Sequence, residues 1–160
     1  MPVRVQLEDF DVGWEIAALR GADPRVGAIA SFIGTVRDVN LGKGVSTLTL
    51  EHYPGMTERS LESICEQARQ RWDILDLLVI HRHGCLQPLD QIVMVAVTSE
   101  HRGEAFAACE FVMDYLKTQA PFWKKEVTPE GGRWVQARDA DDQAAARWDA
   151  AEPGAKERRA

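Results

Sequence analysis

The pattern of hydrophobic and polar positions along the chain predicts an ordered series of strands and helices. Alternating or continuous apolar runs, typical of strands, occupy residues 3–7, 26–37, 45–53, 74–83, 91–99, 122–128 and 132–138. Apolar residues at helical spacing predict two amphipathic helices, one over residues 57–72 and one that includes Ala105 to Leu116. Two main helices set against several strands indicate an α+β fold.

Capping and breaking residues refine these boundaries. A shorter helix is expected over residues 11–20, with Asp11 as its N-cap and Gly21 as its end. Residues 38–44, rich in asparagine and glycine, predict a loop. Pro121 ends the second amphipathic helix, because proline lacks the N–H and disfavours a helical residue before it.

The end of the chain differs in composition from the rest. We expect residues 129–131 to form the turn between the last two strands, and the Ala-rich, charged stretch from Asp139 to form one or two helical turns. The chain contains no internal repeat. These features predict one catalytic domain over residues 1–148, followed by a polar, disordered tail over residues 149–160.

Composition and charge restrict the class of protein. The 160 residues carry a formal net charge of -6, which argues against bulk nucleic-acid binding. The longest uncharged stretch near the N-terminus lies between Arg25 and Arg37, too short for a membrane helix. The three scattered cysteines suit reduced thiols better than a disulfide framework. We expect a soluble, cytoplasmic protein.

One short segment concentrates positive charge in this acidic chain. The sequence MDYLKTQAPFWKKE, residues 113–126, places Lys117, Lys124 and Lys125 around Phe122 and Trp123. Partial burial and mutual repulsion lower a lysine pKa, which suits a general acid or base. Alternation along a strand puts Lys124 and Lys125 on opposite faces, so Lys124 is the better partner for Lys117. The alternative is a solvated cation that interacts favourably with the helix C-terminus.

Two further sites could bind an anion. His101 and Arg102 lie where a strand turns into the second amphipathic helix, and helix N-termini present free N–H groups. The alternative there is an exposed first turn capped by Ser99. Arg37 ends a predicted strand beside the 38–44 loop, a common position for ligand contacts, although a solvated arginine also fits.

Other chemistry has less support. His81 and His83 share a strand face and precede Cys85, but no second ligand pair at a supporting spacing completes a zinc site. The chain has no P-loop, no dinucleotide-binding glycine motif and no serine nucleophile elbow. Each cysteine lies in or beside an apolar run, which does not favour a thiol nucleophile.

Three segments together resemble a known family. LTLEHYPGMTE (48–58), VTSEHRGEAF (97–106) and MDYLKTQAPFWKKE resemble the large, catalytic subunit of molybdopterin synthase, in the right order and at the right intervals. The resemblance implies an α/β hammerhead fold, with an antiparallel sheet flanked by two main helices and a smaller β subdomain. It also implies a sulfurtransferase of molybdenum cofactor biosynthesis, which converts cyclic pyranopterin monophosphate into molybdopterin.

The resemblance further implies a partner. The two sulfurs come from the C-terminal Gly-Gly thiocarboxylate of a small ubiquitin-like subunit, and a homodimer of the large subunit forms the centre of a heterotetramer. We expect no metal and no cofactor in this subunit.

The resemblance also assigns roles to residues. Lys117 and Lys124 match the catalytic lysines. The substrate-binding residues implied by the match are Thr35, Val36, Arg37, His101, Arg102, Lys117, Lys124, Lys125, Glu126 and, from the neighbouring subunit, Arg138.

Two alternative functions, from other classes of protein, stay open. A non-catalytic adaptor for a ubiquitin-like Gly-Gly tail would need an apolar channel but not both lysines. A platform for single-stranded nucleic acid would use the aromatic and basic residues of FWKK, although the net charge of -6 counts against it.

Overall fold

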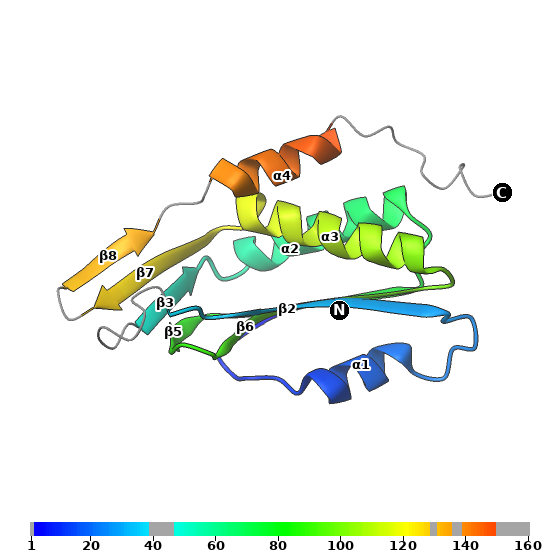
Figure 1. The fold of residues 1–160 in the computed structure, drawn as a ribbon, viewed down its shortest axis with the longest axis horizontal. Coiled ribbons are helices and arrows are strands. Elements are labelled where there is room, and N and C mark those ends of the chain that lie inside the picture. The colour runs from blue at the N-terminus through cyan, green and yellow to red at the C-terminus, as the bar shows by residue number, and fades with distance from the viewer. Residues whose placement is uncertain (1, 39–46, 129–130, 136–138, 150–160) are drawn as a thin grey trace.

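The computed structural model describes residues 2–38, 47–128, 131–135 and 139–149, with the backbone alone over 125–128, 131–135 and 139–141. It consists of one sheet covered by helices on both faces, and a second sheet that projects from one end of the first (Figure 1). This arrangement confirms the predicted α+β fold. No helix among the described residues has the length and apolar character needed to span a membrane.

The first sheet, here called sheet A, has the strand order β1-β4-β6-β2. Its strands are β1 (Val3–Gln6), β2 (Ala28–Thr35), β4 (Asp76–Arg82) and β6 (Gln91–Ser99). The pairs β2–β6 and β4–β6 are antiparallel, as expected, whereas β1 pairs with β4 in parallel. The sheet is therefore mixed, with a short parallel strand added at one edge.

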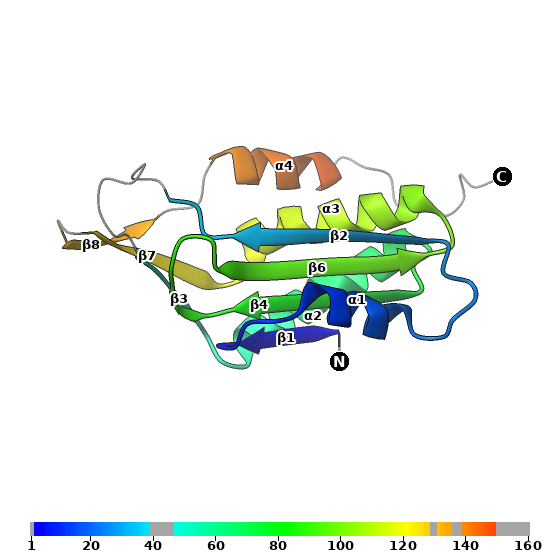
Figure 2. The same cartoon turned by 60° about the horizontal axis from the view of Figure 1, so that its bottom comes forward.

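The central strands β4 and β6 are buried on both faces, which explains their continuous apolar runs. Leu77 and Val79 of β4 contribute to the core under α2 and α3, whereas Leu78 and Ile80 contribute to the core under α1. Figure 2 shows α1 on one side of this sheet and α3 on the other. His81 follows the alternation of Leu77 and Val79, so it lies on the α2 and α3 face.

The second sheet, here called sheet B, has the order β5-β3-β7-β8 and is antiparallel throughout the described strands. Its strands are β3 (Thr47–His52), β5 (Gly84–Leu86), β7 (Phe122–Thr128) and β8 (Gly131–Val135). Strand β5 was not predicted, because three residues are too few to show a period. Gly84 has a φ of 96°, a conformation that favours glycine, where the chain passes from β4 into β5.

The helices begin and end close to the predicted positions. They are α1 (Val12–Arg20), α2 (Met56–Arg71), α3 (Arg102–Gln119) and α4 (Asp139–Asp149). The Asp11 side chain accepts a hydrogen bond from the Trp14 N–H at 2.8 Å, which confirms the predicted N-cap. Gly21, with φ of 55°, follows the last residue of α1 as expected.

Helix α4 is longer than the one or two turns expected for this part of the chain. It lies along α3 (Figure 1). The Trp148 ring packs edge-on against Trp72 and Phe111 at centroid distances of 5.4 and 5.6 Å. The Trp148 indole N–H also donates to Asp114 of α3 at 2.7 Å. These aromatic contacts tie the helix to the domain, and residues 150–160 of the predicted tail lie outside the described part.

Strand β2 is shorter at both ends than the predicted 26–37. The Gly27 N–H donates to the Ser99 carbonyl at 3.0 Å before the strand begins. Its pairing with β6 shifts register between Gly34 and Thr35. This irregularity lets residues 36–38 leave the sheet.

Candidate active site

A short connection between α3 and β7 brings the two predicted catalytic lysines to one end of sheet A (Figure 1). Lys117 lies in the last turn of α3, and Ala120 after the helix is extended, with φ of -80° and ψ of 130°. The Phe122 N–H donates to the Ala120 carbonyl at 2.9 Å, and β7 begins at Phe122. Lys124 then follows on β7, and both lysines are half-buried.

A buried hydroxyl holds this connection in place. Thr57, in the first turn of α2, is 0% exposed. Its Oγ1 donates to the Pro121 carbonyl at 3.0 Å and accepts from the Tyr53 N–H at 3.0 Å. The connection between β3 and α2 is thereby joined to the segment between the two lysines.

The register of sheet B decides which face Lys124 occupies. Lys124 pairs with Leu50 and Phe122 pairs with His52, so these residues share one face of the β3–β7 pair. Leu50 is buried. Lys125 pairs with Thr49, which lies on the opposite face, as the alternation predicted.

His81, on β4, packs against Phe122, the first residue of β7. Its ring is 4% exposed and stacks on Phe122, with centroids 3.7 Å apart and planes 18° apart. The His81 pKa is lowered to about 3, mainly by burial and to a smaller extent by the positive charges of Lys117 and Lys124. Both ammonium groups therefore disfavour protonation of this one imidazole.

Two more histidines extend this group toward the surface. The rings of His52 and His83 lie 4.2 Å apart, and His52 Nε2 lies 3.7 Å from a carboxylate oxygen of Glu58. Partial burial, and then the neighbouring His52, lower the pKa of His83. Within the described residues, no group of three or more histidine, cysteine, aspartate or glutamate side chains is placed to hold a metal ion.

The segment Thr35–Val36–Arg37 lies at the same end of sheet A as β7 (Figure 2). Val36 donates from its N–H to the Asp90 carbonyl at 2.9 Å and accepts from the Leu89 N–H at 2.8 Å. Leu89 has a φ of 76°, an unfavourable conformation for leucine that these contacts help to maintain. The Arg37 side chain is exposed beside this anchored backbone.

His101 and Arg102 lie at the opposite end of the molecule. They begin α3 and are exposed, and the 18 residues of that helix place its start about 25 Å from its end. His101 itself is the N-cap residue, so the alternative that assigned this role to Ser99 is wrong. The Ser99 hydroxyl instead donates to the Asp73 carbonyl at 2.8 Å. A single chain therefore does not bring His101 and Arg102 to the lysines.

The remaining predicted site residues fall on less described parts of the chain. The backbones of Lys125 and Glu126 lie in β7, where Glu126 pairs with Leu48 of β3. Arg138 lies outside the described residues. Burial raises the pKa of Cys65 to about 12 and of Cys109 to about 11, so neither is an activated thiol.

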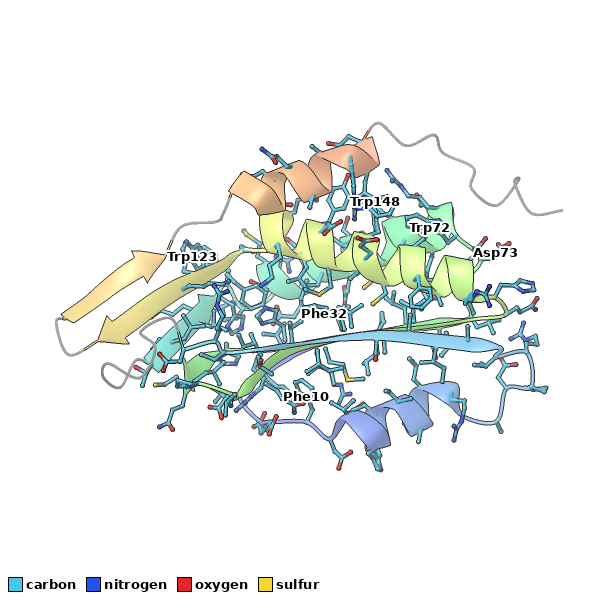
Figure 3. All side chains as sticks on the ribbon, in the orientation of Figure 1. Phe10, Phe32, Trp72, Asp73, Trp123 and Trp148 are labelled. Carbon is cyan, nitrogen blue, oxygen red and sulfur yellow. The ribbon has the colours of Figure 1, made fainter. Side chains whose placement is uncertain are left out.

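Sequence reasoning missed Thr57, and it considered His81 only as a metal ligand. A histidine at the end of a buried strand is a recognisable signal, but its stack on Phe122 depends on how β4 and β7 meet. Figure 3 shows how densely side chains fill the region between Phe32 and Trp123, where sheets A and B join.

Comparisons with known proteins extend this picture. Residues 5–119 match the family model described as MoaE protein. The chain is 67% identical over 146 residues to the molybdopterin synthase catalytic subunit of Ralstonia nicotianae, covering 91% of this chain and 83% of that protein. The solved molybdopterin biosynthesis MoaE protein from Burkholderia ambifaria is 59% identical, with a TM-score of 0.79 over 94% of this chain and 98% of that chain. A chain of the Helicobacter pylori complex of subunits 1 and 2 of molybdopterin-converting factor is 17% identical. Its TM-score of 0.68, over 86% of this chain and 92% of that chain, shows a shared fold.

Proposed function

The chain belongs to the MoaE protein family, and from this membership we infer that it is the catalytic, sulfur-transferring subunit of a molybdopterin synthase in molybdenum cofactor biosynthesis. The observation that carries the proposal is the position of Lys117 at the end of α3 and of Lys124 near the start of β7, which brings both lysines to the end of sheet A where Phe122 stacks on His81. Positively charged side chains near one another suit the binding of an anionic substrate. We place the reaction in the cytoplasm, since the cysteines of the chain are free thiols.

The substrate we propose is cyclic pyranopterin monophosphate, which receives two sulfurs as a dithiolene. Each sulfur is delivered by a small ubiquitin-like subunit that carries a thiocarboxylate on its C-terminal Gly-Gly tail. Glycine suits this delivery, because a chain without side chains brings its backbone close to the lysines. The thiocarboxylate sulfur bonds to a carbon of the pterin side chain as the C–O bond at that carbon breaks and its oxygen leaves. Water then cleaves the acyl–sulfur bond, which leaves a carboxylate on the tail and a thiolate on the pterin.

In this proposal the lysines act on developing negative charge. Cleavage at the acyl carbon passes through an anionic intermediate, and fixed cations of low exposure stabilise such charge better than they could in bulk water. Lys117 and Lys124 supply these cations and transfer protons. Arg37, at the same end of sheet A, binds the substrate phosphate together with Thr35 and Val36, and the neighbouring Lys125 and Glu126 extend the contact made by Lys124.

The position of His101 and Arg102 supports a homodimeric site. They lie about 22–24 Å from Lys117 along α3. If both groups contact one small substrate, His101 and Arg102 must come from a second copy of the chain, and we propose the same origin for Arg138. The active assembly is then two copies of this chain with one small subunit at each end.

Reconstitution tests the proposal directly. The purified chain is mixed with a thiocarboxylated small subunit and cyclic pyranopterin monophosphate, and dithiolene formation is measured. We expect product only with the thiocarboxylate, and none when the partner lacks its last two glycines. Light scattering of the mixture should give the mass of a heterotetramer. Binding of the partner tail without any dithiolene formation would favour the adaptor reading instead.

A further inference from the structure

His81 occupies a position in the candidate site to which the sequence resemblance assigned no role. It ends the buried alternation of β4, and its register partners, Val5 of β1 and Val93 of β6, are apolar. Phe122 covers one face of its ring. Lys117 of α3, Lys124 of β7 and His52 of β3 are the titratable groups of the described side chains that act on it. By its register in β7, Glu126 falls two residues beyond Lys124 on the same strand.

The hydrogen bond of His81 determines which ring nitrogen carries its proton. Nδ1 lies 2.8 Å from the Arg82 carbonyl oxygen. A carbonyl oxygen only accepts, so Nδ1 must carry the hydrogen and Nε2 is the free acceptor of the neutral ring. Rotation of the ring is restricted by the stack on Phe122, which fixes the direction of Nε2.

We propose that His81 is a positioning residue for the lysine pair, and that its Nε2 accepts a hydrogen bond from the ammonium group of Lys117 or Lys124. This inference rests on the proposed function, because it assigns the pair a catalytic task. A neutral acceptor orients an ammonium group without adding the opposite charge that would hold its proton. A carboxylate in the same place would stabilise the charged lysine and make it a poorer acid.

Two conservative variants distinguish the role of Nε2 as an acceptor from the role of Nδ1 as a donor. His81→Asn keeps an N–H near the position of Nδ1, which can still donate to Arg82, but provides no acceptor at the position of Nε2. His81→Gln reaches the position of Nε2 with a carbonyl oxygen. Both variants lose the stack on Phe122, so a purely structural role predicts equal effects. We expect His81→Gln to retain kcat within about threefold and His81→Asn to lose about tenfold, with KM changed less than threefold in both.

A third variant tests how the charge at position 81 affects the titration of the lysine pair. His81→Glu places a carboxylate beside the lysines, and an opposite charge within about 4–6 Å should move the titration of the lysine pair to higher pH by about 1–3 pH units. Carbon NMR of labelled lysine side chains measures this titration without sulfur transfer, with Lys117→Arg and Lys124→Arg for assignment. Glu126→Gln is the control variant, because it measures how much the carboxylate already present on β7 contributes to the titration of the lysine pair. If the wild-type protein makes no dithiolene but His81→Glu still shifts the lysine titration, the proposed function is wrong, whereas the position of His81 beside the lysine pair is supported.

Nitrogen NMR of the wild-type protein provides a test that needs no variant. His81 should remain neutral, with its proton on Nδ1, from about pH 8 to pH 5. A proton on Nε2, equal losses of kcat in His81→Asn and His81→Gln, or an unchanged lysine titration in folded His81→Glu would each overturn the proposal.

Discussion

Thr57→Val removes a hydroxyl that joins three segments of the candidate site while keeping the shape of the side chain. In the folded protein, Thr57 Oγ1 donates to Pro121 and accepts from the Tyr53 N–H, both at 3.0 Å. The residue is 0% exposed, so water cannot replace the lost hydroxyl without local opening. Valine fills the same volume and leaves one carbonyl and one N–H without these partners.

The expected magnitude follows from those two groups. A buried polar group left without a partner costs about 1–3 kcal/mol, so we expect the free energy of unfolding to fall by about 2–4 kcal/mol. The Pro121 carbonyl lies between Lys117 and Lys124, and its release should also displace the lysines. A misplacement of about 1 Å can cost up to about 100-fold in rate, so kcat should fall by about 10- to 100-fold.

Urea denaturation and dithiolene formation measure the two effects separately. Thr57→Ser is the matched control, because it keeps the hydroxyl and loses one buried methyl group, at a cost of about 1 kcal/mol. Its kcat should stay within about threefold of the wild-type value. Equal stability and equal kcat for the valine and serine variants would refute the role of this hydroxyl.

Four further predictions concern other parts of the molecule. Lys117→Ala and Lys124→Ala should each lower kcat by about 100-fold or more with the melting temperature nearly unchanged, and near-normal turnover in both would remove them from the mechanism. Arg37→Ala should weaken substrate binding by about tenfold or more, measured by calorimetry, and an unchanged affinity would contradict its contact with the phosphate. The pKa of folded His81 is about 3, against an ordinary value near 6.5, so the unfolded chain binds its proton first as the pH falls. Stability should therefore decrease by up to about 1.4 kcal/mol per pH unit between pH 6 and pH 4, and His81→Gln should remove this slope in urea titrations. Trp148→Ala should destabilise the domain by about 2–4 kcal/mol through loss of the aromatic contacts of α4, whereas Trp148→Phe should cost less than half as much.

The sequence by itself determined the local structure, because local structure depends on neighbouring residues. Strand β6 has the predicted limits, since an apolar run bounded by polar residues is a signal within nine positions. Asp11 and Gly21 mark the limits of α1 through side-chain capping and a positive φ, which also need no distant partner. The cluster around Phe122 and the choice of Lys124 over Lys125 for the pair followed from strand alternation alone.

Only the tertiary structure decided which of these residues act together. The parallel pairing of β1 with β4 and the three residues of β5 depend on neighbours that lie far away in the chain. The neutral state of His81 likewise arises from burial beneath Phe122 and beside two lysines. Solvent exposure and charge at a side chain are properties of packing, and residues that are distant in the sequence set them.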